Sequence, residues 1–299
     1  MTSTQKGIIF AIGAYISWGL GTIYFKMLTN VPAKEMLSHR ILWSFLLLGF
    51  IIVVSKRLPI LKTMLQNPQK LMMLICSGAL IACNWFVFIW AIGNDQLLEA
   101  SLGYYINPLL TILLGLAFFK ERLSRLQWMS LVLAFTGVMI QIIMVGTLPW
   151  ISLTLAVTFS VYGVIRKKAN VDSFAGMLIE IAAFFPVAVY YLFINDNSIS
   201  GDLLHNASSL NMLLMMAGII TTTPLILFSA AASRLNLSAL GFLQYITPSM
   251  IWLLAVFVYH EPVTQNMLVT FCFIWAALVC FSFDGLYQHR YGAKLATAA

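Results

Sequence analysis

"SLGYYINPLLTILLGLAFFKERL", residues 101–123, is apolar enough to cross a bilayer, yet it carries a proline, Pro108, near its middle. The stretch ends on an acid, Glu121, set among basic residues. A second stretch, "GFLQYITPSMIWLLAVFVYHEPV", residues 241–263, repeats this arrangement with Pro248 and Glu261. Two membrane-like segments therefore place a proline and a glutamate at the same spacing.

Composition assigns the chain to the membrane. Of its 299 residues, 61% are hydrophobic and 9% are charged, whereas soluble domains carry roughly 25% charged residues. The net charge of +7 comes from bases in short loops between apolar runs, which is typical of topology-setting charge and gives no reason to expect a nucleic-acid partner. The four cysteines lie inside apolar runs without metal-like spacing, so we expect neither a metal nor a cofactor.

The apolar runs predict ten membrane-spanning helices. A span needs about 20 apolar residues, and the backbone inside hydrocarbon must satisfy its own hydrogen bonds. The expected helices cover residues 7–27, 36–54, 71–92, 98–118, 125–144, 148–166, 174–194, 210–232, 237–258 and 265–284. The basic loop at 56–70 is a candidate for a short interfacial helix.

The basic residues predict the orientation. With the N-terminus inside, 14 of the 17 Lys and Arg residues fall on the inner side, and only Lys26, Lys34 and Arg40 fall on the outer side. Cytoplasmic loops carry the excess of Lys and Arg. We therefore expect both termini in the cytoplasm, with residues 285–299 forming a cytoplasmic tail.

An internal repeat divides the chain into two halves. An offset of 140 residues aligns Tyr105 with Tyr245, Pro108 with Pro248 and Glu121 with Glu261. The aligned loops differ in charge, and each half holds five helices, so the second half is expected to be inverted. Residues 7–144 and 148–284 are the predicted repeats, in the inverted arrangement of secondary transporters, whose substrate site lies near the midplane.

Several blocks resemble the RarD proteins, in the EamA group of the drug/metabolite transporter superfamily. They are "YFKML", "EMLSHRILWS", "NWFVFIWA", "EASLGYYINPL", "ERLSRLQW", "YGVIRKK" and "TTTPLILFSAAASRLNLSALGFLQYITPS". The resemblance covers residues 8–284. It implies an all-α, ten-helix permease of the bacterial inner membrane, made of two five-helix halves. Because relatives carry amino acids, other metabolites or drugs, it does not identify the solute.

The two prolines mark the expected depth of a central site. Each lies about 10 residues into its helix, and a proline there leaves the carbonyl four residues earlier without its helical partner. Those carbonyls belong to Tyr104 and Gln244. The kinks either line a cavity or serve packing alone.

Polar and aromatic side chains at this depth are the candidates for substrate binding. In hydrocarbon such groups face protein or water, where they line a cavity or join helices. A mainly apolar pocket with a few polar groups would suit a small amphipathic or aromatic solute. The candidates are Trp18, Asn84, Trp85, Tyr104, Tyr105, Asn107, Tyr162, Thr223, Gln244 and Tyr245.

Charged residues give the remaining candidates. Glu180 lies two turns into a predicted span and is expected to pair with Arg166, as a proton-coupling acid or as a structural ion pair.

An outer cluster consists of Glu35, His39 and Arg40. It either attracts an anionic group or caps a helix at the interface. Glu121 and Glu261 are candidate gates, or simply hydrated helix ends.

The leading function is a secondary transporter that moves a small solute by alternating access, with proton coupling and oligomeric state left open. Its central site would lie among the helices at 7–27, 71–92, 98–118, 148–166, 210–232 and 237–258, a choice that rests partly on the resemblance. No Walker A, HExxH or GxSxG motif is present. An intramembrane enzyme, or a channel or passive receptor with the same repeat, is the alternative.

Overall fold

The computed structural model describes residues 1–28, 30–94, 97–145, 150–194, 198–258 and 265–296. Over these residues the chain is helical and contains no strand. Thirteen helices are described: α1 (Ser3–Lys26), α2 (Ala33–Val54), α3 (Leu58–Leu65), α4 (Pro68–Gly93), α5 (Leu97–Phe119), α6 (Arg125–Val145), α7 (Trp150–Ala169), α8 (Ser173–Ala182), α9 (Phe185–Phe193), α10 (Ser208–Ala232), α11 (Leu237–Gln244), α12 (Ile246–Phe257) and α13 (Gln265–Ala296).

The predicted all-α class is confirmed over the described residues. Within the described part of the chain, every expected span falls on helix, and the expected interfacial helix at 56–70 is α3. Among the described residues, six helices are long and apolar enough to cross a membrane, and α8 with α9 forms a seventh, bent candidate. Shorter apolar helical segments cover 103–119 and 268–284.

Two expected helices are divided in the structure. The span expected at 174–194 consists of α8 and α9, which meet at an angle of 50°. Pro186 stands in the first turn of α9, and its missing N–H leaves the carbonyl of Ala182 without a helical partner. The span expected at 237–258 is interrupted at Tyr245, four residues after Gly241 and three before Pro248.

The two helices that carry the matching prolines differ: Pro108 lies inside the continuous helix α5, whereas the helix of Pro248 is divided at Tyr245. The segment expected as a tail from residue 285 onward continues α13 as far as Ala296.

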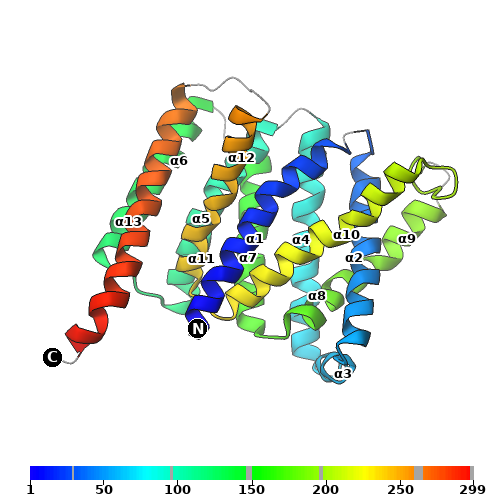
Figure 1. Cartoon of the computed structure of the whole chain (residues 1–299), viewed down its shortest axis with the longest axis horizontal. Coiled ribbons are helices and arrows are strands. Elements are labelled where there is room, and N and C mark those ends of the chain that lie inside the picture. The colour runs from blue at the N-terminus through cyan, green and yellow to red at the C-terminus, as the bar shows by residue number, and fades with distance from the viewer. Residues whose placement is uncertain (29, 95–96, 146–149, 195–197, 259–264, 297–299) are drawn as a thin grey trace.

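The helices stand side by side, and α6 and α13 form a pair at one edge of the molecule (Figure 1). Helix α1 packs against α10, α11 and α12, while α7 packs between α4 and α5. The N-terminus, α3 and the end of α13 all lie toward the lower side in Figure 1. Chain segments that are distant in sequence therefore meet along the middle of the molecule.

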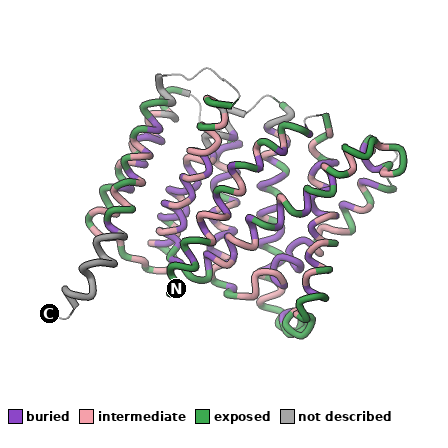
Figure 2. The backbone as a smooth tube through the Cα atoms, in the orientation of Figure 1, coloured by how far each residue is buried: buried purple, intermediate pink, exposed green. Residues whose placement is uncertain are grey.

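Burial follows the arrangement expected for a surface in lipid. Buried residues line the inner faces of the helices, and exposed residues lie on their outer faces (Figure 2). Large apolar side chains are among the exposed ones, including Phe50, Phe118 and Phe135, each more than half exposed. Contiguous apolar surface of this kind would be unfavourable in water, so it fits the membrane environment that the composition predicts.

Glycines bring several helices into backbone contact. A Cβ atom added to Gly241 of α11 would lie 2.8 Å from the carbonyl oxygen of Pro108 and 2.6 Å from a side-chain carbon of Ile112, both on α5. Gly218 of α10 meets the backbone of Trp43 in the same way. Small residues that permit close approach are typical of helix packing in membranes. The contact at Gly241 is the crossing of α5 and α11.

We predict that Gly241→Ala lowers the stability of the protein by about 1–3 kcal/mol, because the new methyl group meets backbone that cannot move aside. Gly49→Ala is the matched control, since a Cβ at Gly49 of α2 meets nothing within 4 Å. That control should gain about 0.5–1 kcal/mol from helix propensity. Thermal unfolding of the purified variants in detergent measures both. Equal melting temperatures for the two variants would contradict the close crossing.

Candidate functional site

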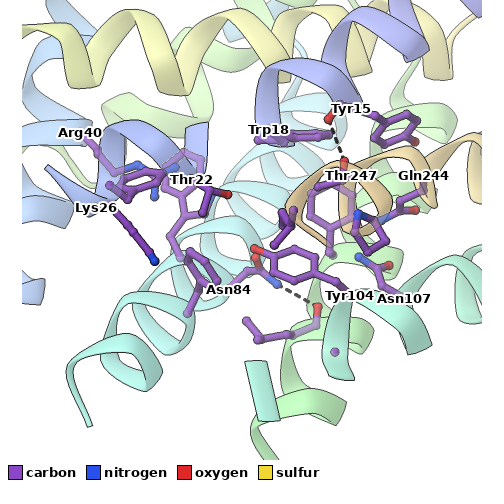
Figure 3. Close-up of a pocket in the computed structure, with 18 residues that line it drawn as sticks. Tyr15, Trp18, Thr22, Lys26, Arg40, Asn84, Tyr104, Asn107, Gln244 and Thr247 are labelled. Atoms are coloured by element: carbon purple, nitrogen blue, oxygen red, sulfur yellow. Dashed lines mark hydrogen bonds between the residues drawn. The ribbon is translucent and has the colours of Figure 1, made fainter. Parts of the chain in front are cut away.

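A cavity of about 260 Å³ lies between the helices and is the candidate site (Figure 3). Seven helices contribute to it: α1, α2, α4, α5, α7, α11 and α12. The lining residues are Tyr15, Trp18, Thr22, Phe25, Lys26, Arg40, Asn84, Trp85, Phe88, Gly103, Tyr104, Asn107, Leu155, Phe159, Gln244, Thr247, Pro248 and Ile251.

The cavity runs from one end of the helices to about their middle. Lys26 is the last residue of α1 and Tyr15 is its midpoint, so this wall extends over about 16 Å at 1.5 Å per residue. Asn107 lies ten residues from the start of α5, at a similar depth to Tyr15. The deep end of the cavity is therefore near the middle of the helices.

Aromatic side chains close the deep end. The rings of Tyr15, Trp18 and Phe159 line the cavity, and each lies within 6.4 Å of the ring of Phe228. Tyr162 stacks on Phe228, with ring centroids 5.9 Å apart. These contacts connect α1, α7 and α10. Phe228 and Tyr162 are each 1% exposed, so tightly packed aromatic rings border this end of the cavity.

Hydrogen bonds fix the polar groups at the same depth. Asn107 Oδ1 accepts hydrogen bonds from Ser160 (2.8 Å) and Thr111 (3.3 Å). Thr247 donates to the carbonyl oxygen of Tyr15 at 2.9 Å. Because its oxygen is engaged by hydroxyl groups, Asn107 directs its amide N–H groups elsewhere, and Figure 3 places this side chain beside Gln244 and Thr247. The deep end thus offers hydrogen-bond donors.

Asn84 is oriented from the opposite wall. Its Nδ2 donates to the carbonyl oxygen of Leu155 at 2.8 Å and to Thr158 at 2.9 Å, so its oxygen is the group left for other partners. The ring of Tyr104 contacts Phe88 edge-on, with centroids 5.5 Å apart. These side chains form the wall made by α4, α5 and α7.

Arg40 reaches the cavity from α2 and is only 5% exposed. Its Nε donates to Thr221 at 2.9 Å, and its guanidinium carbon lies 4.3 Å from the ring centroid of Trp85. The same carbon lies 5.1 Å from the ring centroid of Phe25. In Figure 3, Arg40 and Lys26 occupy one end of the cavity, whereas Asn107 and Gln244 occupy the other.

Six of the ten residues proposed from the sequence as substrate-binding line the cavity: Trp18, Asn84, Trp85, Tyr104, Asn107 and Gln244. The other four lie elsewhere. Tyr105 packs against Phe271 of α13, and the buried Tyr245 donates to the backbone oxygen of Tyr105. Tyr162 lies beneath the aromatic closure. Thr223 is exposed on the outer surface of α10.

Arg166 and Glu180 form an ion pair below the cavity. The Nη1 atom of Arg166 lies 3.2 Å from Oε1 of Glu180, and both side chains are at most 2% exposed. Ser77 donates to the same carboxylate oxygen at 2.5 Å, and Arg166 also donates to Ser229. The expected pairing is therefore present in the structure, outside the cavity lining.

Glu121 caps the start of α11, a helix that is distant from it in sequence. Its carboxylate accepts hydrogen bonds from the backbone N–H groups of Leu237 (2.7 Å) and Ser238 (2.9 Å), at the start of α11. Lys167 lies 3.9 Å from the same carboxylate and donates to the carbonyl oxygen of Leu235. We call this set of contacts the Glu121 cap. Glu261, the repeat partner of Glu121, lies outside the described residues.

Glu35 and His39 behave as a clamp rather than as cavity residues. The Glu35 carboxylate accepts hydrogen bonds from the backbone of Ile199 and Ser200, at 2.9 and 2.7 Å. His39 Nε2 lies 3.0 Å from Ser200 Oγ. The three residues predicted as one outer cluster therefore separate: two hold the segment after α9, and Arg40 points into the cavity.

Arg40 was proposed from the sequence as part of the outer cluster and not as a cavity residue. It was placed at a helix end because the helix was expected to begin at residue 36, whereas α2 begins at Ala33, directly after Pro32. A proline at a helix start is a common signal, and it would have placed Arg40 two turns inside.

Among the described residues, no group of three His, Cys, Asp or Glu side chains could hold a metal ion.

Comparisons with known proteins agree on one family. Residues 5–143 match the model of the EamA-like transporter family. Protein RarD of Escherichia coli (strain K12) is 47% identical over 291 residues, which cover 97% of this chain and 98% of that protein. An uncharacterized transporter of Vibrio cholerae is 47% identical, with 94% and 93% covered, and an uncharacterized transporter of Bacillus subtilis is 40% identical, with 94% and 95% covered.

A solved crystal structure shares the fold. It is 17% identical to this chain, with a TM-score of 0.71, and the match covers 93% of this chain and 97% of the other. At that identity the match speaks for the fold alone.

We expect Arg166→Met to lower stability by about 3–5 kcal/mol, because it leaves the Glu180 carboxylate buried without its partner. The double variant Arg166→Met/Glu180→Gln should recover part of this loss, which a double-mutant cycle in detergent measures. Lys168→Met, an exposed change on the same helix, serves as the control and should be close to neutral. Additive losses in the double variant would show that the two side chains are not coupled.

Proposed function

Because the chain belongs to the RarD group of the EamA-like transporter family, we propose that it is a secondary transporter of the bacterial inner membrane. It moves a small solute by alternating access, and the cavity between α1, α2, α4, α5, α7, α11 and α12 is its central site. The observation that carries this proposal is a cavity that reaches the middle of the helices from one end and is closed by packing toward the other.

The proposed topology has ten spans in two inverted halves, with both termini in the cytoplasm. The charge distribution of the loops supports the orientation. A contact between repeat-equivalent residues supports a two-fold relation between the halves: the hydroxyl group of Tyr245 donates to the backbone oxygen of Tyr105, its partner at the 140-residue offset. Equivalent residues of two halves meet in this way near an axis that relates them.

In this orientation the structure is outward-facing. The Glu121 cap lies on the proposed cytoplasmic side and joins the α5–α6 loop to the start of α11. The hydroxyl group of Tyr15 adds a contact to α11 by donating to the carbonyl oxygen of Leu240 at 3.1 Å. A carboxylate at a helix N-terminus is stabilised by the helix dipole and by free N–H groups. To open toward the cytoplasm, the start of α11 must separate from Glu121.

The repeat supplies the opposite closure. Leu97, the first residue of α5, is the equivalent of Leu237, and Glu261 is the equivalent of Glu121. We assign Glu261 the capping of α5 in the inward-facing state. The two glutamates would then close alternate sides, which explains why an identical spacing of proline and glutamate occurs twice.

Family membership points to transport rather than to an enzyme. Coupling to protons is a further proposal, with Glu180 as its acid. Tyr162 lies beside the Glu180 carboxylate and packs against the aromatic closure of the cavity. A proton path to the solute would therefore pass through Tyr162, and Glu180→Gln would remove the pH dependence of transport.

Carrier function is tested by counterflow. A screen of metabolites and drugs first identifies solutes that raise the melting temperature of the purified protein. Each such solute is then loaded unlabelled into proteoliposomes, and uptake of the labelled solute from outside is followed. A carrier accumulates label transiently against its gradient, whereas a channel equilibrates it and an enzyme releases a changed product. Simple equilibration or conversion would overturn the proposal.

The Glu121 cap gives a second expected outcome. In a background without native cysteines, Thr22→Cys places a thiol in the cavity wall, and a membrane-impermeant maleimide should label it from outside in spheroplasts. Adding Glu121→Ala removes the cap and should reduce this labelling severalfold, because the inward-facing state gains population. Arg122→Ala, an exposed neighbour, is the control and should leave labelling unchanged. Unaltered labelling in Glu121→Ala would show that the cap does not hold the cytoplasmic side closed.

A further inference from the structure

We propose that the transported solute is a small organic anion: its carboxylate binds the guanidinium group of Arg40, and its flat apolar body lies along the aromatic wall of the cavity. The inference rests on the proposed transport function and names its substrate class. It starts from a charge in the cavity that the described protein does not neutralise.

Arg40 is buried and has no acidic partner among the residues that the structure describes. It makes one hydrogen bond, from Nε to Thr221, and two ring contacts, to Trp85 and Phe25. Its terminal nitrogens donate to no side chain or carbonyl group in the described part of the chain. An arginine inside a membrane is costly to bury, and such residues mark binding sites or ion pathways.

The acid closest to it in sequence is committed elsewhere. Glu35 lies five residues before Arg40, and both of its carboxylate oxygens accept hydrogen bonds from Ile199 and Ser200. Other basic residues toward the interior do have acidic partners: Arg166 pairs with Glu180, and Lys167 lies 3.9 Å from Glu121. Arg40 differs from them because it is buried beside a cavity and has no acidic partner among the described residues.

The geometry of Arg40 leaves one edge for a ligand. Trp85 covers a face of the guanidinium group, and Thr221 fixes Nε. The remaining N–H groups form the planar fork that binds a carboxylate through two parallel hydrogen bonds. Because the side chain is held on its other sides, little flexibility is lost when the ligand binds.

The rest of the cavity matches an anion with an apolar body. Its described lining contains two basic residues, Lys26 and Arg40, and no acidic residue, so the described lining offers a cation or the ammonium group of a zwitterion no carboxylate. Trp18 and Phe159 supply flat apolar surface. At the far end, the amide N–H of Asn107, which has no hydrogen-bond partner among the residues described, offers a donor to an acceptor on the solute.

Binding of a matched probe series tests the proposal. Indole-3-acetate, indole-3-acetamide and tryptamine share one aromatic body and differ in charge, and benzoate with benzamide forms a second pair. Calorimetry on wild-type protein in nanodiscs should show at least one carboxylate binding about tenfold or more tightly than its amide, and no binding of tryptamine. Arg40→Gln should weaken carboxylate binding roughly 10- to 100-fold and leave the amide unchanged, as expected for loss of a charged hydrogen bond.

Further variants keep the test decisive. Arg40→Lys retains the charge without the planar fork and should give an intermediate affinity, and Thr221→Val should weaken carboxylate binding by freeing Nε. Lys168→Gln, exposed and outside the cavity, should change nothing. If Arg40→Gln does not fold, Arg40→Lys and Thr221→Val carry the comparison.

Three outcomes overturn the inference: equal binding of carboxylates and amides, no carboxylate binding by wild type, or carboxylate binding indifferent to Arg40. Counterflow separates this result from a failure of the transport proposal. If only neutral or cationic solutes give counterflow, the proposal of an anionic substrate is overturned and the proposal of a carrier is supported. Arg40-dependent carboxylate binding without counterflow supports the anion site and overturns the carrier.

Discussion

The bilayer core offers no water to solvate a buried charge, and the interior of this protein is organised around that constraint. Arg166 and Glu180 satisfy it by pairing, and Glu121 satisfies it by accepting N–H groups at the start of α11. Arg40 is the exception among the cavity residues discussed above, and it faces the space that a solute would fill. These charges with partners in the protein lie outside the cavity lining, whereas Arg40 lies in it.

Much of the site could be predicted from residue type and spacing. Tyr104 and Asn107 share one face of a helix because they are three residues apart, and both line the cavity. Spacing does not show which of the three consecutive threonines at 221–223 faces inward. Each step along a helix rotates the side chain by about 100°, and all three are the same residue type. Thr223 was the residue chosen, whereas Thr221 faces inward and holds Arg40. The rotation of a helix is set by its neighbours, which a single sequence does not show.

Helix ends and breaks were harder to predict, because tertiary contacts decide them. Pro108 and Pro248 occupy equivalent positions in similar sequence, yet the matching helices differ: α5 is continuous and α11 stops at Gln244. In this structure the start of α11 is held by Glu121, while Tyr245 donates to α5. Similar local sequence therefore gives one continuous helix and one divided helix. The expectation of one unbroken helix at 174–194 failed in the same way, since Pro186 determines where a bend can occur but not its angle.

The crossing of α5 and α11 at Gly241 has a mechanical consequence. Gly241 contributes no side chain to this contact with the Pro108 backbone and Ile112, so one helix could pivot on the other with little interdigitation to undo. A pivot displaces the distant helix ends far more than the atoms beside it. Pro108 and Ile112 form this fulcrum, and Gln244 and Asn107 lie next to it. Groups at the deep end of the cavity would thus keep their hold on a bound molecule while the outer rims exchange access.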